Sequence, residues 1–176
     1  MLYSLLIIAF SPDTHCQATD EDSLSDIDLL KSAYILKIAS FIYWPEEALG
    51  EKATPLICII GHDTFHAAYT LLNNQSKYLY RDQADIVEAD ASSILALPCD
   101  IAFVSAAEMT STLRHTLGSA PKHMITISDK RGFAKDIGII ELSERSNRIR
   151  MLINMSNLNG LTVKLSSQLL EVAELL

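Results

Sequence analysis

Two short, mostly apolar runs constrain the fold of this chain more than any other feature. They are PLICIIG at Pro55–Gly61 and CDIAFVS at Cys99–Ser105. Such runs are typical of strands whose two faces are both covered, as in a parallel sheet. Apolar residues at helical spacing follow each run, over Asp63–Asn73 and Ala107–Leu117. This alternation of strands and helices predicts an α/β domain.

The remaining segments extend this prediction. An amphipathic helix is expected from Ile27 to Trp44, with Ser25 as its N-cap and Pro45 at its end. The other expected elements are strands at Ala84–Ala89 and His123–Ser128, a hairpin of Gly138–Leu142 and Arg148–Met155 joined by a turn at Ser143–Asn147, and a final helix at Leu165–Leu176. Together they predict a three-layer α/β/α sandwich, whose mostly parallel sheet carries an antiparallel C-terminal hairpin.

The first residues are expected to be an export signal. The apolar stretch Met1–Phe10 has half the length of about 20 residues that a membrane-spanning helix needs, and it suits the apolar region of a secretory signal. Small residues at Cys16 and Ala18 suit cleavage after Ala18. No Lys or Arg precedes the apolar stretch, and a buried N-terminal strand is the alternative. We therefore expect a signal peptide at residues 1–18 and a single domain at residues 19–176.

The charge balance limits the possible partners. The 176 residues include 14 Lys and Arg against 22 Asp and Glu, which gives a net charge of −8. A nucleic-acid-binding protein needs a basic face for the negatively charged phosphates. Anionic lipid also carries negative charge, and it repels an acidic surface. The balance therefore argues against nucleic acid and against direct lipid binding.

Motifs for catalysis and for cofactor binding are missing from the sequence. It has no G-x-S-x-G nucleophile motif, and GHDTFH after the first apolar run lacks the further glycines and the lysine of nucleotide-binding loops. His62 and His66 have a spacing that can hold a metal on one helical face, but no third ligand is placed convincingly. We expect no catalytic residue, no cofactor and no metal, and hence a protein that is not an enzyme.

Cys58 and Cys99 lie in two predicted strands of the same sheet. In an exported chain they could form a disulfide, and closing a loop of about 40 residues would stabilise the fold by roughly 3–4 kcal/mol. Two buried free thiols are the alternative. The residues alone leave both possibilities open.

Six residues are candidates for contact with a partner or a ligand: Trp44, Lys130, Arg131, Phe133, Arg150 and Asn154. Trp44 lies at a helix end, where packing is the alternative to a contact role. Lys130, Arg131 and Phe133 belong to the charged loop Asp129–Asp136, whose Phe could also pack against the sheet. Arg150 and Asn154 share the polar face of the second hairpin strand.

In this order, the segments resemble the YfiR family of secreted bacterial proteins. The resemblance extends from about Lys31 to the C-terminus, through KSAYILKIASFIYWP, PLICIIG with HDTFHAA, CDIAFVS, ITISDKRGFAKDIGIIEL and NRIRMLINMSNLNGLTVKLSSQLLEVA. It implies a periplasmic α/β/α domain that represses an inner-membrane diguanylate cyclase by contacting its periplasmic region. Such repression lowers cyclic-di-GMP signalling and biofilm formation.

The resemblance also implies further properties. Family members tend to form homodimers, and an outer-membrane lipoprotein can sequester them. Cys58 and Cys99 match a cysteine pair of the family, which favours the disulfide. Some members carry a second cysteine pair around the segment that corresponds to Gly132–Leu142, and this sequence has none there. The alternative function is a periplasmic sensor of a small ligand that acts through another receptor, such as a histidine kinase.

Overall fold

The computed structural model of the chain describes residues 25–45, 49–50, 52–73, 84–146 and 148–176. The expected signal peptide at residues 1–18 lies outside these residues. The helices are α1 (Asp26–Ala39), α3 (His62–Asn73), α5 (Ser111–Leu117), α6 (Met155–Leu158) and α7 (Ser167–Glu171). The strands are β1 (Ile42–Tyr43), β2 (Leu56–Ile60), β3 (Asp85–Glu88), β4 (Ile101–Val104), β5 (Ile125–Ser128), β6 (Ile140–Arg145), β7 (Arg148–Ile153), β8 (Lys164–Leu165) and β9 (Glu174–Leu175).

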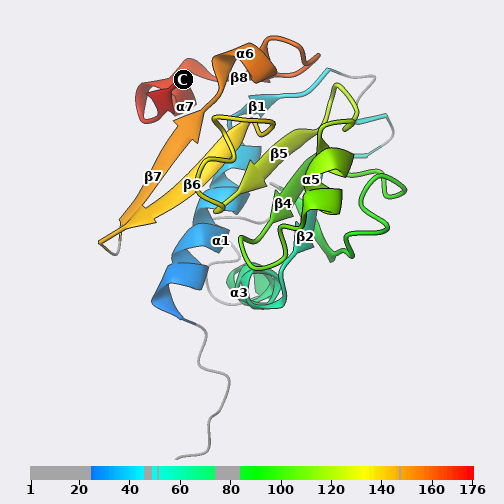
Figure 1. The fold of residues 1–176 in the computed structure, drawn as a ribbon. Coiled ribbons are helices and arrows are strands. Elements are labelled where there is room, and N and C mark those ends of the chain that lie inside the picture. Colours follow the sequence, from blue (N-terminus) through cyan, green and yellow to red (C-terminus); the bar gives the residue numbers. More distant parts are fainter. Residues whose placement is uncertain (1–24, 46–48, 51, 74–83, 147) are drawn as a thin grey trace, which may run out of the picture.

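A seven-stranded sheet with the order β3-β2-β4-β5-β6-β7-β9 forms the centre of the fold (Figure 1). Its pairs are parallel from β3 to β6, β6 and β7 form an antiparallel hairpin, and β9 pairs in parallel with β7. A second, small antiparallel sheet joins β1 to β8. The predicted α/β class, with a mostly parallel sheet and an antiparallel hairpin, is confirmed.

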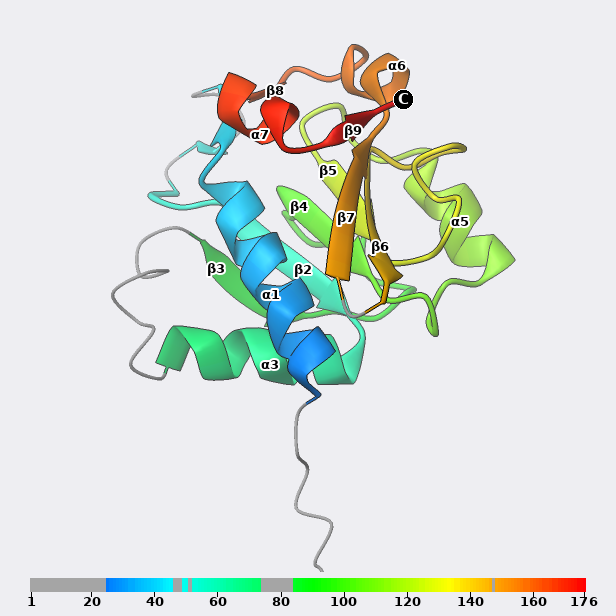
Figure 2. The same cartoon turned by 90° about the vertical axis from the view of Figure 1, so that its left-hand side faces the viewer.

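The apolar runs are strands because each face of the sheet is packed. Ile57 and Ile59 of β2 lie in one core with residues of α1 and α3, whereas Cys58 and Ile60 lie in a second core with Leu113 of α5. Alternate residues of a strand point to opposite faces, so one apolar run serves both cores. Figure 2 shows α1 and α3 on one side of the sheet and α5 on the other.

The hairpin is packed differently on its two faces. Its apolar residues Leu142, Met151 and Ile153 belong to the first core. On the other face, Ser143 and Arg150 lie opposite each other, and α5 packs over β2 and β4 instead. The second helical layer therefore stops short of the hairpin, which leaves a polar face of the sheet for a site.

Cys58 and Cys99 form a disulfide, with their Cα atoms 5.8 Å apart. Both residues are fully buried in the second core, and the bridge joins Cys58 of β2 to Cys99, which lies two residues before the start of β4. The pairing that the resemblance favours is therefore present in the structure.

The first helix has the predicted N-cap residue and ends before the predicted last residue. Ser25 is its N-cap, with a side chain that accepts a hydrogen bond from the backbone of Asp28. The prediction that the helix continues to Trp44 is wrong, because α1 ends at Ala39. Ile42 pairs instead with Leu165 in the small sheet, a contact that local spacing does not reveal.

Two other boundaries also differ from the prediction. The helix expected from Ala107 begins only at Ser111, because the Thr110 side chain caps it by accepting a hydrogen bond from Leu113. The turn expected from Ser143 is shorter, since β6 continues to Arg145. The β6–β7 pairing therefore extends into residues whose polar character suggests a turn.

The predicted helix over Leu165–Leu176 is also wrong. Only Ser167–Glu171 is helical, and the chain then runs back along the sheet as β9. Leu169 is buried, but Val172 is 74% exposed, so the apolar stripe does not form one packed face. The C-terminal residues thus form an edge strand beside β7.

Candidate functional site

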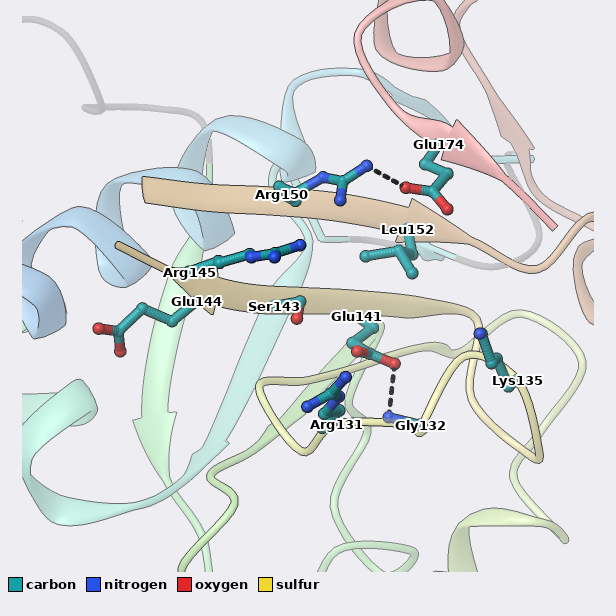
Figure 3. Close-up of a pocket in the computed structure, with 10 residues that line it drawn as sticks. All are labelled: Arg131, Gly132, Lys135, Glu141, Ser143, Glu144, Arg145, Arg150, Leu152 and Glu174. Atoms are coloured by element: carbon teal, nitrogen blue, oxygen red, sulfur yellow. Dashed lines mark hydrogen bonds and ion pairs between the residues drawn. The ribbon is translucent and has the colours of Figure 1, made fainter. Parts of the chain in front are cut away.

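A hollow of about 450 Å³ lies on the polar face of the hairpin, and we call it the hairpin hollow (Figure 3). Its lining comes from β6, β7, β9 and the loop after β5, and its volume lies within the usual range for small-molecule sites. Its residues are the basic Arg131, Lys135, Arg145 and Arg150, the acidic Glu141, Glu144 and Glu174, and Gly132, Ser143 and Leu152.

Glu141 fixes the loop that forms one wall of the hollow. This carboxylate is only 2% exposed, and its Oε2 accepts hydrogen bonds from the backbone N–H groups of Gly132 at 3.0 Å and Ala134 at 3.2 Å. Hydrogen bonds from backbone N–H groups to a carboxylate are stronger than bonds between neutral groups. The Glu141 carboxylate therefore holds the loop against β6, and the loop's own N–H groups are its hydrogen-bond partners.

Two further contacts hold the same loop from neighbouring elements. Asn154, the N-cap of α6, donates from Nδ2 to the carbonyl of Ala134 at 2.6 Å and accepts a bond from the backbone of Asn157 at 2.9 Å. Asp136 forms an ion pair with Arg114 of α5. The wall of the hollow is thus anchored to a strand and to two helices.

At its beginning, the loop is tied to the first helix. Lys31 Nζ lies 2.7 Å from Oδ2 of Asp129, whose Oδ1 accepts a hydrogen bond from the backbone of Ala106. Burial acts to lower the pKa of Lys31, but the hydrogen bond and charge of Asp129, helped by Asp28 and Glu144, outweigh it and raise the pKa above 10.5. The ammonium form of Lys31 is therefore the stabilised one.

The arginines of the hollow differ in how they are paired. Arg150 Nη2 lies 2.5 Å from Glu174 Oε2, and both side chains are about half exposed. Within the described residues, Arg131, Lys135 and Arg145 have no acidic partner within 4.0 Å. Three of its four described cationic side chains are therefore not in an ion pair.

The structure brings some of the sequence candidates together and separates others. Arg131 and Arg150 both line the hairpin hollow. Lys130 and Arg131 line a neighbouring hollow of about 310 Å³ against α5, together with Phe133. Phe133 is only 5% exposed and packs in the second core. Its position corresponds to the alternative expectation, in which the loop Phe packs against the sheet.

Trp44 and Asn154 have other surroundings. Trp44 is partly buried against the first core, on the far side of the sheet from Phe133. Its Nε1 has no hydrogen-bond acceptor within the part of the chain that the structure describes. Asn154 serves as a cap and an anchor of the loop, so it positions the site instead of lining it.

Sequence reasoning missed Lys135, Glu141, Arg145 and Glu174 as residues of the site. A usable signal exists for two of them, because Glu141 and Arg145 share one face of β6 with Ser143 through strand alternation. Glu174 gives no such signal, since its position depends on β9, which was not predicted.

The histidine pair lies elsewhere. His62 Nδ1 is 3.1 Å from Glu88 Oε1, and the His62 and His66 rings are 6.3 Å apart. Across the described ranges, no three His, Cys, Asp or Glu side chains are grouped so that they could hold a metal ion. In the same ranges, no helix is long and apolar enough to cross a membrane.

The fold and the hollow define a class of small α/β domain with a polar, ligand-sized site beside an uncovered hairpin. Residues 28–174 match the model of the YfiR/HmsC-like family, and the chain belongs to this family. The family is regulatory and not catalytic, and it acts through a partner regulatory system. A comparison with curated proteins found no match.

Proposed function

We propose that this chain is a periplasmic repressor that restrains an inner-membrane diguanylate cyclase by contacting its periplasmic region. Membership of a regulatory family over residues 28–174 is the observation that carries the proposal. The disulfide supports it too, because such bridges persist in oxidising compartments such as the periplasm. In this account, repression lowers cyclic-di-GMP and biofilm formation, with export directed by residues 1–18.

The loop between Asp129 and Asp136 is the contact surface that we propose. Its exposed basic residues Lys130 and Arg131 project from a backbone that Glu141 and Asn154 hold in place. A pre-formed loop loses little conformational entropy on binding. The complementary surface on the cyclase would be acidic, since charge complementarity favours both encounter and specificity.

A binding experiment tests this proposal. The purified chain is titrated against the periplasmic regions of the membrane-anchored diguanylate cyclases of the same organism. One region binds the chain, and the charge reversal Arg131→Glu weakens that binding at least tenfold. Lys122→Glu is the matched control, because Lys122 is exposed and does not line either hollow. Absence of binding to every cyclase region would overturn the proposal.

Two further partners belong to the same proposal: a second copy of the chain, as a homodimer, and an outer-membrane lipoprotein that sequesters it. The alternative function, a small-ligand sensor acting through a receptor such as a histidine kinase, is favoured by one observation, the volume of the hairpin hollow. Binding to a kinase's periplasmic region in the same titration, with none to a cyclase, would select it.

A further inference from the structure

The hairpin hollow concentrates positive charge on an acidic chain. Four of the 14 Lys and Arg residues line it, although the whole chain carries a net charge of −8. These four side chains share one hollow, whereas acidic residues outnumber basic ones over the chain as a whole. This local excess therefore needs a specific explanation.

The strand register of the hairpin makes this local excess of positive charge less favourable. Arg145 of β6 lies directly opposite Arg148 of β7, and Arg150 is two residues further along β7. Like charges directly opposite each other in an antiparallel pair are destabilising. In the described residues, neither Arg145 nor Arg148 has an acidic partner within 4.0 Å. A bound anion would relieve this repulsion.

Each carboxylate around the hollow either has a partner within the protein or is directed away from the basic side chains. Glu141 accepts two backbone hydrogen bonds from the loop. Glu144 lies one residue out of phase with Ser143 and Arg145, is directed away from the other side chains in Figure 3, and contributes to the field at Lys31. Among the residues that the structure describes, only Glu174 is paired with an arginine of the hollow, namely Arg150.

Glu174 is carried by a weakly attached segment. Its strand, β9, has two residues, lies at the edge of the sheet and is exposed. Two backbone bonds at the chain end support it, from Leu176 to the carbonyl of Ile153 at 2.9 Å and from Met155 to the carbonyl of Leu176 at 3.2 Å. Short, exposed terminal segments open at low free-energy cost.

We propose that the hairpin hollow binds a small anion with a carboxylate or phosphate group between Arg131, Arg145 and Arg150, and that this anion displaces Glu174 from Arg150. Guanidinium groups bind both kinds of group through paired hydrogen bonds. Glu174 then acts as an internal competitor, and its displacement loosens β9. The inference concerns the chain alone and depends on neither receptor named above.

Titration of the isotopically labelled full chain, followed by NMR, tests the inference. Citrate is the probe for the carboxylate and inorganic phosphate the probe for the phosphate, each at constant ionic strength maintained with sodium chloride. At least one probe gives saturable shifts at Arg131, Arg145 and Arg150, and the identity of that probe assigns the group. Hydrogen exchange of the Leu176 amide becomes faster when the probe is bound.

Three variants separate the parts of the inference. Arg145→Ala raises the dissociation constant at least tenfold, whereas Glu174→Gln lowers it severalfold by removing the competitor. Lys122→Ala is the control for general charge and leaves it unchanged. Shifts that do not saturate with either probe, or that persist in Arg145→Ala, would overturn the site. Weaker binding in Glu174→Gln, or unchanged exchange at Leu176, would overturn the displacement of Glu174.

Discussion

Lys31 of α1 and Asp129, the residue directly after β5, form an ion pair with Nζ and Oδ2 2.7 Å apart, and each side chain is only 11% exposed. The pair joins the helix that covers one face of the sheet to the loop that forms the candidate site on the other. Lys31 also lies 3.7 Å from Asp28 on the same helix. The position of the loop therefore depends on a contact with α1.

This ion pair predicts a loss of stability at alkaline pH. The pKa of Lys31 is raised above 10.5 in the folded protein. Its contribution is therefore fully present below pH 10.5 and is lost as the pH rises through the folded value. In urea unfolding, the free energy of the wild type should fall more steeply above pH 10.5 than that of Lys31→Met.

Lys122→Met is the control for the alkaline experiment, since Lys122 is exposed and has no ion pair within the described residues. It should follow the wild-type pH dependence. Equal slopes for wild type and Lys31→Met above pH 10.5 would contradict the assignment of the shift to Asp129.

The disulfide predicts a large effect of reduction. Cys58 and Cys99 are 41 residues apart, and closing a loop of that length is worth about 3–4 kcal/mol in the chain-entropy model. Unfolding and refolding in a reductant should lower the free energy of unfolding by roughly that amount. The same treatment should leave the double variant Cys58→Ala/Cys99→Ala unchanged. A wild type equally stable with and without reductant would show that the bridge does not contribute.

Glu141→Gln should loosen the loop at the hollow. The change removes the charge that strengthens the hydrogen bonds from Gly132 and Ala134, and we expect a loss of about 2 kcal/mol in the free energy of unfolding. Hydrogen exchange at those two amides should become faster than in the wild type. Glu108→Gln, at an exposed position, is the control and should change neither quantity. Unaltered exchange at Gly132 and Ala134 would refute the anchoring role of Glu141.

Gly138→Ala should destabilise the protein through Phe133. A Cβ atom at residue 138 would overlap the buried Phe133 ring, and such overpacking costs roughly 1–3 kcal/mol. At Gly160, the nearest atom to an added Cβ is the carbonyl oxygen of Asn157 at 3.5 Å, an ordinary contact. Gly160→Ala should therefore stay within about 0.5 kcal/mol of the wild type. Equal stabilities of the two variants in urea unfolding would contradict this packing.

The central strands were predictable from sequence because their signal is local. Ile57 to Ile60 and Ile101 to Val104 are apolar on both faces, and a strand buried on both faces requires this pattern. The errors arose where distant pairing decides the structure. Ile42 leaves the helical pattern to pair with Leu165, and Glu174 leaves it to pair with Leu152.

The site was predictable only in part, for the same reason. Arg131 and Arg150 were candidates because a charged loop and the polar face of a strand are visible in the sequence. That both line one hollow follows from the packing of the loop on β6 through Glu141, which no spacing rule reveals. The sequence allowed Phe133 either a contact role or a packing role. In the structure its ring is buried, in space that is free because residue 138 is a glycine.

The most direct test of the proposed function is the cellular cyclic-di-GMP level after deletion of the gene. The level should rise, and it should return to normal when the deletion is complemented with the wild-type chain or Lys122→Glu. Complementation with Arg131→Glu, at equal protein amount, should leave it high. A cyclic-di-GMP level that does not change on deletion would contradict the account.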